Sequence, residues 1–252
     1  MPTPHRCVAA AALSCRKSPV ARVAAAGAPW GLALALLLGG TAAATAAPAL
    51  PRVVEVPSRP AFIKPPGGSE TPARPGQVLA ARTQLRTQKP GRMQVQLANG
   101  RSFRLGGDAV ARLGAEGLDL ESGQIIAWVN PGSKGGGSPL KIRTRVGTAS
   151  IMGTTVFIDA TPEAVKVFSW EGHVTLTADS GQRFELHSGE QVVFEQGAWL
   201  PPRRLSLEEA GARRAKSLLL NGFDTPMETL PVIERELGLT PLPANAASPS
   251  PR

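Results

Sequence analysis

Two histidines are the side chains best suited to acid–base or metal chemistry beyond the amino-terminal region. His173 and His187 have carboxylates near them in the sequence, at Glu171, Glu185 and Glu190, and could bind a metal if their strands were neighbours. Both lie beside turn-forming dipeptides, however, and the sequence has neither an H-x-H nor an H-E-x-x-H spacing. We therefore expect no metal site and no cofactor.

Other catalytic patterns also fail to appear in the sequence. There is no G-x-S-x-G elbow for a serine nucleophile. Glu171 and Glu190 could act as a carboxylate pair on a sugar only if the fold brought them together, and both are expected in turns. Lys134 stands before its glycines and a strand follows, unlike a phosphate-binding P-loop, so we interpret Asn130–Pro139 as an exposed loop. The chain is predicted not to be an enzyme.

Short strands are the elements that must position any site. Apolar and polar residues alternate over 93–97 and 103–105, and Asn99-Gly100 between them favours a tight hairpin turn. Further strand-like segments lie at 118–120, 124–129, 140–144, 149–152, 155–158, 164–170, 173–177, 183–186 and 191–195. Frequent turns between β-branched segments predict an all-β domain over 77–197, a sandwich or roll of about ten short strands.

The amino-terminal residues 1–46 have the composition of a secretory signal peptide. Basic residues precede an apolar stretch rich in leucine, and Ala44-Thr45-Ala46 fits a cleavage site. An uncleaved membrane anchor over 23–46 is the alternative, because no charged residue lies between Arg22 and Arg52. The first interpretation predicts a periplasmic or secreted protein, and the second an inner-membrane protein whose domain faces the periplasm.

Three further segments complete the predicted organisation. Residues 47–76 contain eight prolines, at 48, 51, 57, 60, 65, 66, 72 and 75, which predicts an extended linker without helix or sheet. Ser206 and Glu209 form a capping-box pattern that opens the first of two short α-helices predicted for 203–240. The tail, 241–252, is rich in proline, alanine and serine and is expected to be disordered.

Charge and cysteine content exclude several classes of protein. Cys7 and Cys15 are the only cysteines, and both lie in 1–46, so the exported part has no disulfide and no thiolate metal site. The net charge is +9; without the four basic residues of 1–46 it is about +5, a modest excess that favours anionic surfaces. No basic run with interleaved aromatic residues is present, so we expect no nucleic-acid binding. The basic residues clustered around the first hairpin are candidate contacts for a partner or polymer: Arg82, Arg86, Lys89, Arg92, Arg101, Arg104 and Arg112.

Five segments, in order, resemble the FecR domain family. They are 97–105 (LANGRSFRL), 118–124 (LDLESGQ), 144–157 (TRVGTASIMGTTVF), 167–174 (VFSWEGHV) and 186–191 (LHSGEQ). Together they cover nearly the whole β region. The residues that we interpret as markers of this fold are Asn99, Gly100, Gly153, Thr154, Gly172 and Gly189.

The resemblance implies a periplasmic module. In the best-known members it senses an outer-membrane transporter and signals through one membrane helix to a cytoplasmic sigma-factor regulator. Here about 22 residues precede the apolar stretch, too few for the cytoplasmic segment. Met152 and Arg145 also stand where the family commonly has arginine and proline.

We therefore expect a stand-alone, exported FecR-like module that is not catalytic and that binds or signals in the bacterial cell envelope. An envelope protein is the expected partner. The alternative is an anionic envelope polymer, a polysaccharide or peptidoglycan, bound by the basic residues around the first hairpin. A more remote alternative is transmembrane regulation of a sigma factor linked to iron uptake.

Overall fold

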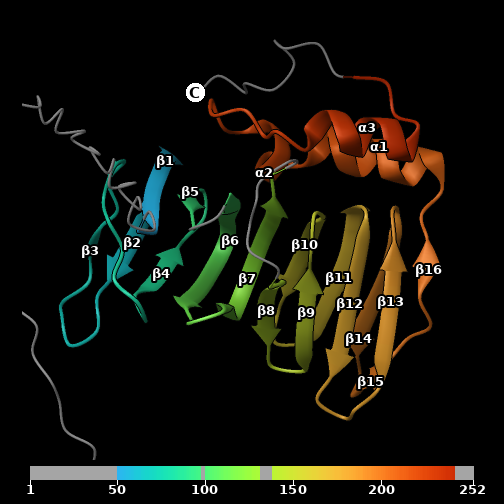
Figure 1. Cartoon of the computed structure of the whole chain (residues 1–252), viewed down its shortest axis with the longest axis horizontal. Coiled ribbons are helices and arrows are strands. Elements are labelled where there is room, and N and C mark those ends of the chain that lie inside the picture. Colours follow the sequence, from blue (N-terminus) through green and yellow to red (C-terminus); the bar gives the residue numbers. More distant parts are fainter. Residues whose placement is uncertain (1–49, 98–99, 131–137, 242–252) are drawn as a thin grey trace, which may run out of the picture. The chain divides into compact units, whose positions relative to one another are not determined.

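One continuous, mostly antiparallel sheet contains all sixteen strands in residues 50–97, 100–130 and 138–241, which the computed structural model describes (Figure 1). The predicted signal peptide, Asn99, residues 131–137 of the predicted loop and residues 242–252 of the predicted tail lie outside these ranges. None of the helices within the ranges is long and apolar enough to cross a membrane.

The strands pair in an order that differs from their order in the sequence. In chain order they are β1 (Arg52–Ser58), β2 (Ala61–Lys64), β3 (Thr71–Pro72), β4 (Gln84–Thr87), β5 (Arg92–Gln96), β6 (Arg101–Leu113), β7 (Gly117–Val129), β8 (Leu140–Thr144), β9 (Gly147–Ile151), β10 (Thr155–Ala160), β11 (Ala164–Glu171), β12 (His173–Ala178), β13 (Arg183–His187), β14 (Glu190–Glu195), β15 (Ala198–Trp199) and β16 (Arg203–Arg204). The main path runs β13-β12-β9-β8-β7-β10-β11-β14-β15, and β6 joins β7 to the strands that precede it. Among the strands that the structure describes, only β7 and β8 pair in parallel.

The inner face of the sheet buries one large apolar cluster. Strands β8 and β9 alternate buried with more exposed residues, as expected for strands with one face on a core. The central strands β6 and β7 instead carry nearly continuous buried runs, at 102–106 and 125–128, because both of their faces are covered. The all-β class predicted from the sequence is confirmed, although the described strands number sixteen rather than about ten.

The expectation that 47–76 is a linker is wrong for residues 52–72. Strand β1 pairs with β5, β2 pairs with β4, and Val53, Ala61 and Ile63 are buried in the main core. The prolines are tolerated because they lie where the ladder needs no donor: Pro57 falls in an irregular part of edge strand β1, and Pro60 lies between β1 and β2.

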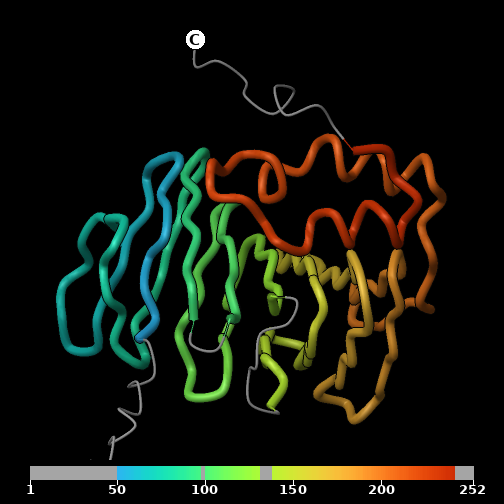
Figure 2. The backbone as a smooth tube through the Cα atoms, turned by 45° about the horizontal axis from the view of Figure 1, so that its top comes forward, coloured from blue at the N-terminus to red at the C-terminus, as the bar shows by residue number. Residues whose placement is uncertain are grey.

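Three helices rather than two follow the strands, and they cover part of the outer face of the sheet. They are α1 (Leu207–Lys216), α2 (Leu218–Asn221) and α3 (Leu230–Leu237), drawn together along one side of the sheet in Figures 1 and 2. The predicted capping box of Ser206 and Glu209 is present at α1, and Ser217 separates α1 from α2 by capping the latter. The helices bury a second apolar cluster with Ile126, Trp128, Phe168 and Trp170 of the sheet.

Candidate functional site

The basic residues predicted around the first hairpin do not form one uniform face. Several are paired: Arg86 contacts Glu70 at 2.5 Å, Arg112 contacts Glu121 at 3.0 Å, and Lys89 lies 3.7 Å from Asp108. Arg101 donates to the carbonyl of Ser138, and Arg92 donates to the Ser58 hydroxyl at 3.0 Å. Arg82 is exposed. The structure therefore brings these cations to one region but neutralises part of their charge.

Arg104 is not a surface residue, and its prediction as a partner contact is wrong. Its side chain is on the outer face of β6, opposite Phe103 and Leu105, but α2 and the loop after it cover that face, and only 1% of Arg104 is exposed. Gly106, also in β6, shows how close this cover is, because a Cβ there would lie 3.1 Å from Leu219. The alternation of residues along β6 correctly predicts that Arg104 is on the outer face of the strand, but it does not predict that the helices bury this face.

The buried guanidinium of Arg104 holds the end of α2 against the sheet. Its Nη1 donates to the carbonyls of Leu219 and Leu220 at 2.9 and 3.3 Å, its Nη2 donates to the carbonyl of Thr225 at 2.6 Å, and its Nε donates to Gln94 at 2.8 Å. Phe223 lies over the guanidinium at 4.2 Å. Burial lowers the pKa of Arg104 to about 10, although Glu55 and Glu228 oppose that change, so it remains a cation at neutral pH.

Glu55 of β1 fixes the same loop from the other side. Its carboxylate accepts the backbone N–H groups of Asp224 and Thr225 at 2.8 and 2.9 Å. Burial alone would raise the pKa of Glu55, but these hydrogen bonds and the charge of Arg104 hold it below its ordinary value. A strand near residue 55 and a loop near residue 224 are thus joined by charge-assisted hydrogen bonds.

A second buried polar group lies where α3 meets β10 and β11. The Thr155 hydroxyl is 2.9 Å from Glu171 and 2.8 Å from the hydroxyl of Thr229, and Glu236 accepts from the backbone N–H of Gly172 at 3.0 Å. Burial raises the pKa of Glu171 to about 7, the charge of Glu236 adds to the increase, and the bond from Thr155 opposes it. Glu171 therefore changes charge near neutral pH, unlike an exposed glutamate.

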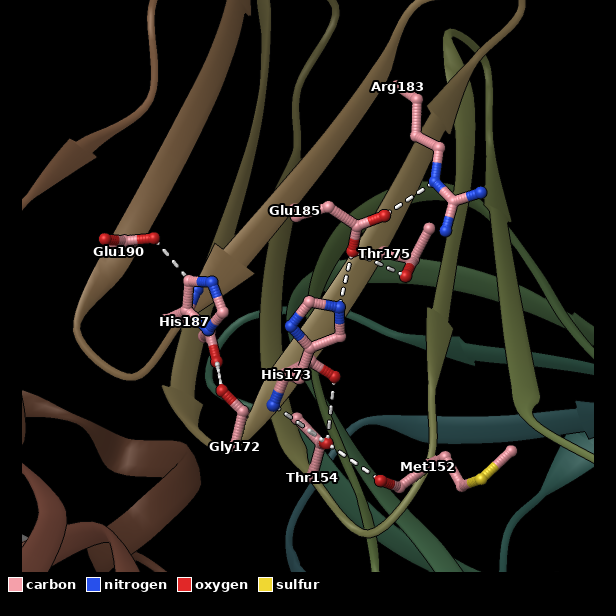
Figure 3. A network of polar contacts seen from close by, with 10 residues as sticks. Met152, Thr154, Gly172, His173, Thr175, Arg183, Glu185, His187 and Glu190 are labelled. Atoms are coloured by element: carbon pink, nitrogen blue, oxygen red, sulfur yellow. Dashed lines mark hydrogen bonds and ion pairs between the residues drawn. The ribbon is translucent and has the colours of Figure 1, made fainter.

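The two histidines face each other across the hairpin of β12 and β13. Their ring centroids are 5.0 Å apart, and Figure 3 shows them on neighbouring strands. His173 Nε2 lies 2.5 Å from Glu185, which also accepts from Thr175 at 2.9 Å and from Arg183 at 2.6 Å (Figure 3). Burial would raise the pKa of Glu185, but these three contacts lower it.

This histidine network pairs an imidazole with a carboxylate, and the threonine hydroxyls beside it already have hydrogen-bond partners. The nearby hydroxyl of Thr154 is engaged by the backbone of Met152 and His173, as Figure 3 shows. Within the residues that the structure describes, no group of three histidine, cysteine, aspartate or glutamate side chains could hold a metal ion. The arrangement is a polar surface on the hairpin at one end of the main path of the sheet.

Four of the predicted fold markers are glycines that lie between consecutive strands. Gly100, Gly153, Gly172 and Gly189 have positive φ angles of 69°, 64°, 76° and 81°. At Gly172 the backbone N–H is shared between Ser188 and Glu236, so the turn also contacts α3. A side chain at Gly172 would be strained by its φ angle and would meet Thr154 at 2.9 Å.

Sequence reasoning missed the junction between the helices and the sheet. The signal was the run Ile125–Trp128, which is apolar without alternation and therefore indicates a strand buried on both faces. The ion pair of Arg214 in α1 with Glu234 in α3, at 2.9 Å, gave no such signal, because nothing in the sequence shows that these helices touch. The structure thus adds a second buried layer to the predicted domain.

Comparison with protein families gives a match over the central part of the chain. Residues 83–175 match the model of the FecR protein family, and this segment runs from just before β4 to β12. This segment is therefore similar to a FecR domain. The FecR match supports a signalling or regulatory role for the chain.

The comparison with solved structures gives more distant matches. Two crystal structures of a candidate anti-sigma factor from Parabacteroides distasonis ATCC 8503 are 21% and 20% identical to the chain, with TM-scores of 0.39 and 0.45. They cover 45% and 54% of this chain, which spans 55% and 64% of theirs. None of the curated proteins matches the chain.

Proposed function

We propose that the chain is an exported, non-catalytic regulatory module of the bacterial cell envelope that binds a protein partner. The observation that carries this proposal is the FecR match at 83–175. The predicted signal peptide or anchor in 1–46 places the domain on the periplasmic side of the membrane in this proposal.

The engagement of polar side chains supports binding rather than catalysis. Arg104, Glu55 and Glu171 are directed into bonds that hold the helices on the sheet, and a catalytic group would need a free acceptor or donor facing a substrate. Some of the polar groups at the surface are held by one another, as Glu185 is by Thr175 and Arg183. Such fixed side chains lower the entropy cost of binding a partner.

The outer edge of β13 is the surface that we assign to the partner. This strand pairs with β12 and with no other strand in the described part of the chain, so its second edge can accept an extended segment. Arg183, Glu185 and His187 project from one face of this strand and supply a positive charge, a negative charge and an imidazole, and the first two are held together at 2.6 Å. A partner strand with complementary charges fits this pattern.

Site-specific photo-crosslinking in envelope preparations tests this assignment. A photoreactive residue at position 183 or 187 should give one discrete protein adduct that survives high salt. The matched control is position 143, because Arg143 is also exposed on a strand but lies on β8. Equal adducts from position 143, or no protein adduct from 183 and 187, would contradict the proposal.

An anionic envelope polymer is the second candidate for the ligand of this chain, and the observation that favours it is a groove lined by basic residues. Lys64, Arg82 and Arg112 line a groove of about 390 Å³ beside Pro65-Pro66-Gly67, and only Arg112 has a carboxylate partner among the described ion pairs. Replacing Lys64 and Arg82 by serine should then weaken retention of the polymer in a salt-dependent way. Salt-sensitive retention of polymer without any protein would favour this function over the first.

A further inference from the structure

A cavity of about 330 Å³ lies between the outer face of the sheet and the corner formed by α1 and α2. Its floor consists of side chains from three adjacent strands: Gln124 of β7, Phe157 and Asp159 of β10, and Lys166 and Trp170 of β11. Arg213 and Lys216 of α1 and residues 217–219 close it from the helical side. Its volume lies at the lower end of the range typical of small-ligand pockets.

The floor of the cavity is set by strand register. Gln124, Asp159 and Lys166 are opposite one another on β7, β10 and β11, so their side chains share one face of the sheet. Gln124 donates to Asp159 at 3.0 Å, which fixes the acidic member of this row. The next row contains Phe157, and Trp170 adds a second ring, so one part of the floor is apolar.

Two buried donors without a partner belong to residues that line this cavity. They are the indole Nε1–H of Trp170, in a side chain that is 1% exposed, and Nη1 of Arg213. The other end of Arg213 is held, because Nη2 donates to Gln191 at 2.9 Å and the guanidinium stacks on Phe168 at 4.5 Å. Buried donors are normally satisfied, so two unsatisfied donors on residues that line one cavity favour a ligand with an acceptor group.

The charges around the cavity favour an anion. Lys166, Arg213 and Lys216 supply three cations, and Asp159 is the single carboxylate in the lining. None of the three cations takes part in an ion pair among the residues that the structure describes. Burial, with repulsion from Arg203, lowers the pKa of Arg213 while Glu209 opposes the change.

We propose that this cavity binds a small amphipathic anion, a molecule with one carboxylate on an aromatic or short aliphatic body. The carboxylate would accept from Arg213 Nη1 and Trp170 Nε1, and the body would pack on Phe157, Leu218 and Leu219. This inference goes beyond the proposed protein-binding function, because it concerns a different surface and a different class of ligand. A ligand there would contact the sheet and α1 together.

Two-dimensional NMR of the full exported chain tests the proposal, because indole N–H groups give resolved signals. The probe is 2-naphthoate, and its neutral isostere is 2-naphthylmethanol. The Trp170 signal is assigned by its loss in Trp170→Phe, which keeps an aromatic ring but removes the donor. Naphthoate should shift this signal saturably, and the alcohol should bind at least about ten-fold more weakly, since it lacks the charge that Arg213 would pair with.

Variants separate the cavity from other binding. Arg213→Met should weaken naphthoate binding at least about ten-fold, and Lys166→Met should weaken it by a smaller factor without disturbing a buried contact. Arg143→Met is the matched control, because it removes an exposed arginine remote in sequence from the lining, and it should change nothing. If Arg213→Met fails to fold, Lys166→Met decides the question.

The proposal is overturned if millimolar naphthoate leaves the Trp170 signal unchanged, if the alcohol binds as tightly as the anion, or if Lys166→Met and Arg143→Met behave alike. It is also overturned if an acidic, aromatic peptide shifts the signal and naphthoate does not, because the cavity would then take part in a protein interface. These outcomes are independent of the crosslinks at β13.

Discussion

At the scale of single residues, burial makes the charge of Glu171 depend on pH in the neutral range. Glu171 is 4% exposed, and its carboxyl group lies near Glu236 of α3 and accepts a hydrogen bond from Thr155, which in turn contacts Thr229. Because its pKa rises from 4.5 to about 7, the folded protein holds this proton more tightly than the unfolded chain does. The protonated form therefore stabilises the packing of α3.

We predict that Glu171→Gln removes a pH dependence from stability. The stabilisation by protonated Glu171 is fully present below pH 4.5 and is lost as the pH rises through 7. Between these pH values the free energy of unfolding of the wild type should therefore fall by up to roughly 3 kcal/mol relative to that of the variant. Urea unfolding at several pH values measures this difference. Glu195→Gln, on the exposed part of β14, is the control, and parallel curves for wild type and Glu171→Gln would contradict the prediction.

A second residue-scale prediction concerns Arg104. Arg104→Met keeps much of the buried volume but leaves the carbonyls of Leu219, Leu220 and Thr225 without their shared donor. Buried acceptors without partners each cost about 1–3 kcal/mol, so the free energy of unfolding should fall by about 3 kcal/mol or more. Chemical denaturation measures the loss. Arg143→Met should change it by less than about 0.5 kcal/mol, and an equal effect of both variants would disprove the role of Arg104.

At the scale of elements, the sequence predicted the positions of the strands better than the packing of the helices on them. Strands β8 to β14 were predicted within a few residues because turn-forming glycines separate segments whose apolar residues alternate. The helices of the outer layer were predicted, but which residues of the sheet they cover was not, because Arg104 and Trp128 contact residues about 100 positions later in the chain. Local patterns carry no information about such distant contacts, and the cavity between the layers was missed for the same reason.

The apolar contact of α3 with the sheet gives the element-scale prediction. Ile233 is fully buried in the second cluster, so Ile233→Ala should lower the free energy of unfolding by about 2–5 kcal/mol. It should also speed amide hydrogen exchange in α3 more than in β6, if the helix opens before the sheet. Leu207→Ala, at a side chain that is 62% exposed in α1, is the control. Unchanged stability in Ile233→Ala would show that α3 contributes little to the packing.

At the scale of the whole described unit, the FecR match covers less than the folded structure. The match begins at residue 83, yet β1 and β2 contribute Val53, Ala61 and Ile63 to the same core as the matched strands. Glu55 of β1 also bonds to the loop before α3. The first strands, the matched domain and the helices therefore share their contacts, and we expect them to unfold together.

This expectation is tested by Ile63→Ala, in the segment whose proline content predicted a linker. Ile63 is 2% exposed, and its loss should reduce the free energy of unfolding by about 2–5 kcal/mol with a single transition seen by both tryptophan fluorescence and circular dichroism. Val78→Ala is the control, because Val78 is 58% exposed between the same strands and β4. The expectation is contradicted if neither Ile63→Ala nor Val53→Ala changes the unfolding transition. In that case β1 and β2 unfold separately from the rest of the unit, and the contact of Glu55 with the loop before α3 does not couple them to it.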